Sequence, residues 1–501
     1  MPGNADFSLI KIGLKQMPDT MNLYPNLHAM PSHRFRSHVA LLLPVLLLIS
    51  LLPATADVTL ATVFSDRMVL QAEAAVPVWG WADAGEEVSV SFAAQTKTTK
   101  ADAAGHWRVT LDPLKAGEAG TMTVKGTNTI NIKDVLAGEV WLASGQSNMH
   151  ANLGVRHPDK EKILDESEDP WVRQFTVVRN DKLASPRELA GVWRAANRAN
   201  LTASRTDGDS SVAYFFSREL RKKLNRPIGV LHASVGATPI QAWMPGGKSY
   251  QTMIEPLAPF AIRGAIWYQG ESNLERNQTA EYAELLTTHV AAWRKLWGQG
   301  EFPFLFVQLA PFRYSKKNVG PLKDNPVGPM ELPLFWEAQT AARSTIPNSG
   351  IAVIHDSVPD SELDNIHPQN KRIPGERLAV LALAKTYGQK DVLGEGPFYR
   401  EMSVEGAKVR VKFTGIGTGL ATRDGQAPNL FEIAGEDKKY VSAEAVIDGD
   451  GVLVSSANVP KPIAVRFAWS ETARPNLMSK EGLPACPFRT DDWSVKETPR
   501  Q

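Results

Sequence analysis

Between residues 136 and 390 the chain alternates short apolar runs with amphipathic stretches, and this alternation limits the folds that it can adopt. The apolar runs that read as strands are residues 140–143, 228–233, 261–267, 304–309 and 351–354. Apolar residues with helical spacing lie between them, at 212–224 and 282–296, and a last helix is expected at about 375–387. Strands that alternate with helices are typical of a mainly parallel sheet covered on both faces. We therefore predict a three-layer α/β/α domain over 136–390.

On both sides of this region the pattern changes to a period of two. From residue 58 to about 135, alternating segments such as 87–92 and 106–111 are separated by turn residues, which predicts an antiparallel β-sandwich over 57–135. Alternation returns after residue 394, with 409–413 and 464–469 as the clearest strands and a tight turn at 448–451. We predict a β-rich C-terminal module over 391–501.

The first 56 residues read as a secretory signal region. Arg34 and Arg36 precede an apolar stretch at 39–52 and a small-residue cleavage site that ends at Ala56. The apolar stretch is shorter than the ~20 residues that a membrane-spanning helix needs, which favours cleavage over anchoring. Translation from Met30 would give a signal of ordinary length. We predict a secreted or periplasmic protein that has no membrane partner after cleavage.

The composition argues against several classes of partner and cofactor. Lys and Arg total 55 against 54 for Asp and Glu, so there is no cationic excess to hold a nucleic acid. Cys486 is the single cysteine, and no intramolecular disulfide can form. The sequence has no cysteine cluster and no spacing typical of a zinc site. We expect no metal and no cofactor, and the oligomeric state stays open.

Polar motifs follow the candidate strands of the central region. They are Gly-Gln-Ser-Asn at 145–148, Val-Gly-Ala-Thr at 235–238, Gln-Gly-Glu-Ser-Asn at 269–273 and Asp-Asn-Ile-His-Pro at 364–368. Parallel strands end at one edge of a sheet, which is where such folds bind ligands. We expect the four motifs to form one site.

The residue types in these motifs suit ester hydrolysis by a serine. Ser147 would be the nucleophile and His367 its general base, because imidazole titrates near neutral pH. Asp364, three residues earlier, would orient the imidazole. The backbone N–H groups of Ser147 and Gly236 and the side-chain amide of Asn273 would form the oxyanion hole.

Other chemical assignments of these motifs are weaker. Ser272 is a competing nucleophile, but the chain lacks the Gly-x-Ser-x-Gly elbow of ordinary α/β-hydrolases. Glu271 and Asp364 would make a paired-carboxylate glycosidase, which leaves Ser147 and His367 without roles.

The orienting carboxylate also has alternatives. Asp356 and Asp360 precede His367 as well, and either becomes the orienting group if Asp364 points away. A purely structural interpretation makes Asp364 a helix cap and Asn273 a partner for backbone groups. The joint occurrence of all these residues at successive strand ends favours the catalytic interpretation.

Three of these blocks resemble the sialate O-acetylesterase family of the SGNH hydrolases. They are Gly-Gln-Ser-Asn-Met at 145–149, Trp-Tyr-Gln-Gly-Glu-Ser-Asn at 267–273 and Asp-Asn-Ile-His-Pro at 364–368, and segments 64–71 and 138–141 add to the resemblance. It implies a flavodoxin-like α/β/α fold, a metal-free serine mechanism and O-acetylated carbohydrates as substrates, sialic acid first. Acetylxylan or another polysaccharide is an alternative substrate. A noncatalytic carbohydrate-binding protein is an alternative of a different class.

The sugar site is predicted from aromatic and amide side chains near the motifs. Trp243 and Tyr268 offer faces for a sugar ring and Gln241 an amide for its hydroxyls, and Gln146 and Glu271 are further candidates. The loop at 236–243 resembles a substrate-facing loop that often reads Gly-Gly-Thr-x-Ile-Glu-Ala-Trp. Ala237 and Gln241 of this chain depart from it, which leaves the identity of the sugar open.

Overall fold

The computed structural model describes residues 57–495 except 154–156, 158, 183–184, 204–207, 318–319 and 325. The predicted signal region, residues 1–56, lies outside the described residues. Among the helices that are described, none is long and apolar enough to cross a membrane.

A mainly parallel sheet forms the centre of the molecule, in the order β10-β9-β11-β8-β12-β13-β14. Five parallel strands match the predicted ones: β8 (Thr129–Gly145), β11 (Ile228–Ser234), β12 (Gly264–Tyr268), β13 (Phe304–Val307) and β14 (Ser349–Ala352). Two further strands were not predicted, β9 (Asp169–Val178), parallel to β11, and β10 (Ala190–Ala196), antiparallel to β9. The prediction of a parallel α/β core is confirmed.

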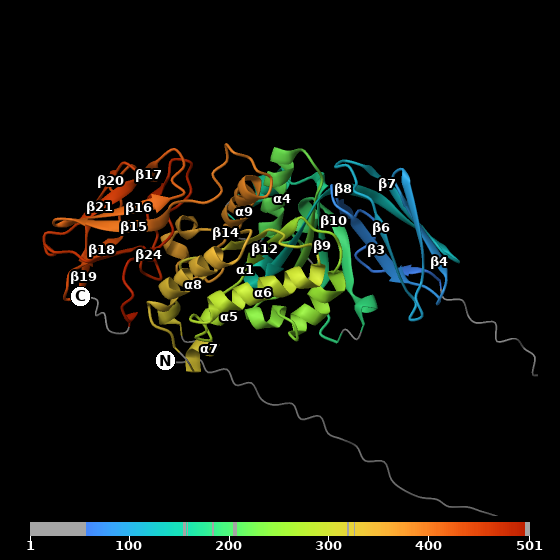
Figure 1. Ribbon diagram of the computed structural model, residues 1–501, viewed down its shortest axis with the longest axis horizontal. Helices are drawn as coiled ribbons and strands as arrows, with labels where there is room; N and C mark the ends of the chain where they lie inside the picture. Colours follow the sequence, from blue (N-terminus) through green and yellow to red (C-terminus); the bar gives the residue numbers. More distant parts are fainter. Residues whose placement is uncertain are drawn as a thin grey trace, which may run out of the picture. The chain divides into compact units, whose positions relative to one another are not determined.

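Four long helices pack in two pairs, α4 (Ser211–Leu224) with α9 (Arg372–Lys385) and α6 (Tyr282–Trp297) with α8 (Glu331–Thr345). In Figure 1 the pair α4 and α9 lies above the strands, and α6 and α8 lie below them. Helix α9 begins three residues before its predicted start. Gly375 lets it approach α4 closely, because a Cβ there would lie 2.6 Å from the Val212 carbonyl oxygen.

Strand β8 is 17 residues long and belongs to two regions of the molecule. Its first part pairs with β7 (Ala119–Lys125), and its last part lies between β11 and β12 in the central sheet. A separate three-stranded sheet contains β1 (Thr59–Leu60), β3 (Val76–Trp81) and β6 (His106–Leu111). The boundary predicted between residues 135 and 136 therefore falls inside one continuous strand.

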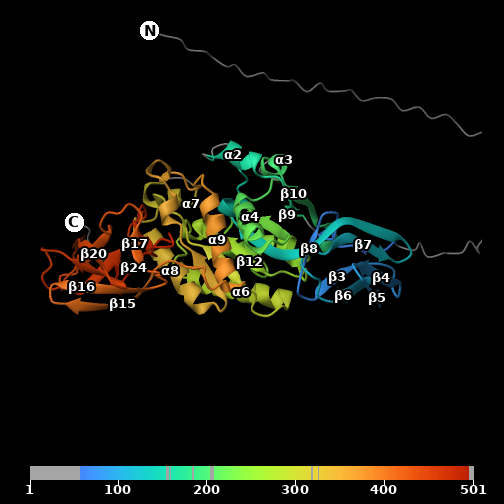
Figure 2. The same cartoon turned by 90° about the horizontal axis from the view of Figure 1, so that it is seen from above.

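The C-terminal region is built from small antiparallel sheets, and its strands lie at the left of Figure 2. One contains β15 (Phe398–Glu405), β16 (Lys408–Thr414), β21 (Gly451–Ser455) and β20 (Glu444–Asp448). Asp448 pairs with Gly451 across the predicted turn, and Gly449 takes a φ of +62° there. Further strands are β18 (Phe431–Ala434), β19 (Tyr440–Ser442), β22 (Ala464–Phe467) and β24 (Phe488–Arg489) in one sheet and β17 (Leu420–Thr422) with β23 (Leu477–Ser479) in another.

Glu139 is a fully buried carboxylate in β8, eight residues before Ser147. Arg263 Nε donates to it at 2.7 Å and Arg226 donates at 3.0 Å. The Tyr387 hydroxyl, just beyond α9, lies 3.1 Å from the same carboxylate. One buried carboxylate thus links the strand that carries the nucleophile to three other segments.

Candidate active site

The nucleophile turn starts where β8 ends. Gly145 has a φ of +139°, and a Cβ there would lie 2.1 Å from the Tyr268 carbonyl oxygen, so a side chain would block the close approach of β8 to β12. The Gln146 N–H donates to the same carbonyl at 3.0 Å. Helix α1 (Ser147–His150) follows at once and puts Ser147 at its first position, half-buried. The predicted strand-to-turn arrangement is present.

Ser147 and His367 lie in direct contact although 220 residues separate them in the chain. The distance between Ser147 Oγ and His367 Nε2 is 2.8 Å. The Asn365 side chain braces the histidine segment, accepting from the His367 N–H at 3.1 Å and donating to its carbonyl at 2.8 Å. Gly236 is also close, since a Cβ on it would lie 3.6 Å from Ser147 Cβ. Three predicted site residues are therefore brought together.

Asp364 is placed differently from its prediction. Its carboxylate accepts from the Arg313 guanidinium at 2.6 Å, its side chain is 60% exposed, and Lys317 donates to its carbonyl oxygen at 3.0 Å. Its carboxylate is thus engaged in an ion pair with an arginine. The three-residue spacing between Asp364 and His367 did not by itself determine the partner of this carboxylate, because Arg313 binds it.

The two alternative carboxylates are also bound to arginines. Asp356 forms a two-pronged ion pair with Arg377 at 2.6 and 2.7 Å. Asp360, which is 79% exposed, pairs with Arg474 of the C-terminal region. Both carboxylates are therefore held by arginines of other segments.

Asn273 is completely buried, and its side-chain amide is fully used. Its Nδ2 donates to Gln278 Oε1 at 2.8 Å and to Gln241 Oε1 at 3.1 Å. Its Oδ1 accepts from the Ile240 N–H at 2.9 Å and from Gln269 Nε2 at 2.7 Å. Donation to an oxyanion therefore requires one of these bonds to be exchanged. The structure corrects the expectation of a free donor.

The aromatic candidates for the sugar site are wrong, because both are core residues. Trp243 is 0% exposed, donates its indole N–H to Thr238 Oγ1 at 3.0 Å and packs edge-on against Trp267. Tyr268 is 1% exposed and lies in β12. A buried ring has no face for a sugar.

Gln146 is likewise a structural residue rather than a substrate ligand. It is 3% exposed, and its Oε1 accepts from Gln269 Nε2 and the Ser272 N–H, both at 3.1 Å. These bonds tie the β8 turn to the turn after β12. Of the predicted sugar residues only Gln241 keeps partial exposure.

Glu271 is buried beside the nucleophile turn and does not face a substrate. It is 3% exposed and accepts from Asn148 Nδ2 at 2.5 Å. Burial raises the pKa of this carboxyl to about 7. Lys371, which is 5% exposed and donates to Asn148 Oδ1, went unnoticed in the sequence. In the sequence, its position four residues after His367 is the one feature that connects it to the site.

Ala237 adopts a backbone conformation that suits glycine. Its φ is +58°, in the left-handed region that a Cβ disfavours. The similar family loop has glycine at this position, and the conformation gives the physical reason. The departure noted in the sequence therefore keeps the loop's shape at the expense of local strain.

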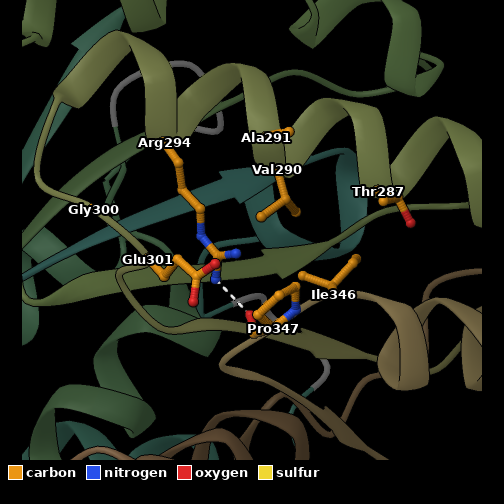
Figure 3. A pocket seen from close by; sticks show the side chains of 8 residues that line it. All are labelled: Thr287, Val290, Ala291, Arg294, Gly300, Glu301, Ile346 and Pro347. Atoms are coloured by element: carbon orange, nitrogen blue, oxygen red, sulfur yellow. Dashed lines mark hydrogen bonds between the residues drawn. The ribbon is translucent and has the colours of Figure 1, made fainter.

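Other features of the surface lie away from these residues. A pocket of about 390 Å³ is lined by Thr287, Val290, Ala291, Arg294, Gly300, Glu301, Ile346 and Pro347. Figure 3 shows Arg294 pointing across it toward the Pro347 carbonyl, to which it donates at 2.7 Å. None of the predicted site residues lines this pocket. Within the described residues, no group of three or more His, Cys, Asp or Glu is placed to hold a metal ion.

Known proteins resemble this chain over most of its length. The family model described as "Carbohydrate esterase, sialic acid-specific acetylesterase" matches residues 137–335. The sialate O-acetylesterases of Homo sapiens and Pongo abelii are each 30% identical over 385 residues, which cover 67% of this chain and 72% of theirs. The chain belongs to the sialate O-acetylesterase family. As a member of this carbohydrate esterase family, the protein is a carboxylic ester hydrolase.

A solved structure of a carbohydrate acetylesterase from Xanthomonas citri is similar in fold and sequence. It is 36% identical, with a TM-score of 0.78, and the alignment covers 87% of this chain and 100% of that one. The match thus spans the central sheet and most of the flanking regions.

Proposed function

We propose that the protein removes O-acetyl groups from sialic acids with Ser147 as the nucleophile and His367 as the general base. The observation that carries the mechanism is the 2.8 Å contact between Ser147 Oγ and His367 Nε2. The relatives named sialate O-acetylesterase support sialic acid as the sugar.

The reaction would proceed in two steps through an acetyl-enzyme. His367 Nε2 takes the proton of the Ser147 hydroxyl while Oγ attacks the acetyl carbonyl carbon, and the same proton passes to the sugar oxygen as it leaves. His367 then takes a proton from water, whose oxygen attacks the acetyl carbon; the bond to Ser147 Oγ breaks, acetate leaves, and His367 returns the proton to Oγ. Both steps require only acyl transfer at Ser147 and proton transfer at His367, and no group is oxidised or reduced.

The negative charge of the tetrahedral intermediates needs hydrogen-bond donors at the nucleophile turn. We assign this role to the backbone N–H groups of Ser147 and Gly236; a Cβ on Gly236 would lie 3.6 Å from Ser147 Cβ, which supports the nearness of the two residues. Asn273 becomes a third donor if a substrate displaces its bond to Gln241, the longer of its two donated bonds.

The domain architecture and the cellular location of the protein are two further parts of this proposal. We infer a flavodoxin-like, three-layer SGNH hydrolase domain between an N-terminal β-sandwich and a C-terminal β-rich module, supported by the two helix pairs and the separate sheets. We also infer secretion or periplasmic location from the signal pattern that ends at Ala56.

A substrate panel tests the choice of sugar. Acetate release would be measured from O-acetylated sialic acids, acetylated xylo-oligosaccharides and p-nitrophenyl acetate. We expect kcat/KM to be higher for sialic acid than for the xylo-oligosaccharides by roughly 10-fold or more, because a site built for one sugar leaves polar groups unpaired with another. The reverse order would favour the polysaccharide alternative. Failure to hydrolyse any ester would contradict the proposed activity.

Replacement of single carboxylates tests which of them orients His367. We propose that Asp364 does so with the oxygen that Arg313 leaves available, and we expect Asp364→Asn to lower kcat by about 10- to 100-fold. This loss is smaller than for a buried triad carboxylate because Asp364 is 60% exposed and shared with Arg313. Asp360→Asn is the matched control and should change kcat by less than about two-fold. A larger loss in the control would transfer the role to Asp360.

A further inference from the structure

Three buried polar side chains lie behind the nucleophile turn and have no part in the reaction steps above. They are Asn148 of α1, Glu271 of α5 (Glu271–Leu274) and Lys371, which immediately precedes α9. Their exposed fractions are 1%, 3% and 5%. Buried charges are costly, so a cation and a carboxylate placed here require an explanation.

Asn148 connects the two reacting residues through their sequence neighbours. It directly follows Ser147, and its Nδ2 donates at 3.1 Å to the carbonyl oxygen of Ile366, which directly precedes His367. The same Nδ2 donates to Glu271 Oε1 at 2.5 Å, and Lys371 Nζ donates to Asn148 Oδ1. One amide therefore ties the serine turn to the histidine segment.

We propose that Lys371 and Glu271 are positioning residues that hold the Asn148 amide in one orientation and thereby maintain the contact between Ser147 and His367. This inference rests on the proposed roles of Ser147 and His367. It adds two residues that do not touch the substrate but control the geometry of those that do.

The Lys371 ammonium on one side of the Asn148 amide and the Glu271 carboxylate on the other fix the orientation of that amide. An ammonium can only donate, and an ionised carboxylate and a carbonyl can only accept. If the Asn148 amide turned by 180°, its NH2 would face the Lys371 ammonium, and its oxygen would face the Glu271 carboxylate. All its bonds would be lost at once. An apolar environment would impose no such preference, and the link to Ile366 would then depend on one neutral hydrogen bond.

The buried environment couples the charges of Glu271 and Lys371. Burial is the main influence on both groups: it raises the pKa of Glu271 and lowers that of Lys371, while each charge favours the other. The Lys371 ammonium also lies 6.0 Å from the centre of the Tyr268 ring, and two further carboxylates act on the pair, Glu362 on Lys371 and Glu275 on Glu271. Loss of either member therefore removes the opposite charge that favours ionisation of the other.

The test compares two lysines at opposite ends of α9. Lys371→Met is expected to lower kcat for p-nitrophenyl acetate by roughly 10- to 100-fold with little change in KM, because a displacement of about 1 Å costs that much. Lys385→Met removes the same charge at the last residue of the helix, where Lys385 pairs with Glu395 at 2.9 Å. We expect it to change kcat by less than about two-fold, whatever it does to the melting temperature.

A second pair of variants keeps the test valid if Lys371→Met does not fold. Glu271→Gln retains an acceptor for Asn148 Nδ2 and Glu271→Ala does not, so kcat should be higher in the glutamine variant at equal helical content by circular dichroism. The rate of Ser147 phosphonylation by an organophosphate should fall in parallel with kcat, since both require the serine to be aligned with its base.

The outcomes separate this proposal from the proposed function. Turnover by Ser147→Ala would overturn the proposed function. Loss of turnover in Ser147→Ala, combined with a wild-type kcat in folded Lys371→Met or with equal kcat in the two Glu271 variants, would overturn the positioning role alone.

Discussion

Replacing Ser147 by alanine is expected to lower kcat for acetate release by ~10⁴-fold or more, because the acetyl-enzyme can no longer form. His367 stays in place to activate water, and the backbone donors at Ser147 and Gly236 remain, so a small residual rate is expected. The measurement is enzymatic detection of acetate from O-acetylated sialic acid and from p-nitrophenyl acetate, with substrate binding measured separately.

Ser272→Ala is the matched control for this experiment. Ser272 is the competing serine of the second motif, and it is 1% exposed, one residue after Glu271. We expect its replacement to change kcat by less than about ten-fold. If Ser272→Ala abolished turnover and Ser147→Ala did not, the nucleophile would be misassigned. If both variants bound the sugar and the wild type released no acetate, the protein would be a noncatalytic binder.

Replacing Glu139 by alanine should destabilise the protein by about 3 kcal/mol, because it removes the buried acceptor of two half-buried arginines. Glu139 is 0% exposed and accepts from Arg263 at 2.7 Å and from Arg226 at 3.0 Å. The free energy of unfolding would be measured by urea titration with tryptophan fluorescence. Glu139 lies in β8, so the loss of its side-chain bonds should destabilise this strand.

Glu73→Ala provides the control, since Glu73 contacts the same two arginines from the surface. It is 51% exposed and lies 3.0 Å from Arg226 and 3.8 Å from Arg263. Solvent screens such a pair, so its loss should cost less than about 1 kcal/mol. Equal effects of the two replacements would contradict the role given to the buried carboxylate.

The parallel core could be predicted because its strands are continuous apolar runs. Strands β9 and β10 were missed for a physical reason that β9 illustrates. Its buried positions include Arg173, Gln174 and Thr176, which read as exposed in the sequence. Arg173 is tolerated because its guanidinium donates to the carbonyl oxygens of Arg67, Asp134 and Pro170. Two of those acceptors, Arg67 and Asp134, come from segments that no local pattern reveals.

The site was predicted best where chemistry and strand ends coincide. Ser147, Gly236 and His367 lie together as expected, because parallel strands deliver their following loops to one edge. Trp243 and Tyr268 failed because exposure cannot be read from residue type. Asp364 was expected to face His367, yet Arg313, 51 residues earlier, holds its carboxylate.

The amino-acid sequence by itself determined the family, the parallel core and the edge at which the polar motifs meet, since these depend on periodicity and on residue identity at strand ends. Only the tertiary structure decided which polar groups face the reaction and which are used on one another. Asn148, Glu271 and Lys371 illustrate this. Glu271 lies 123 residues and Lys371 lies 223 residues after Asn148 in the chain, yet the Asn148 side chain bonds to both. Hydrogen bonds form over about 3 Å, and only folding sets distances on that scale.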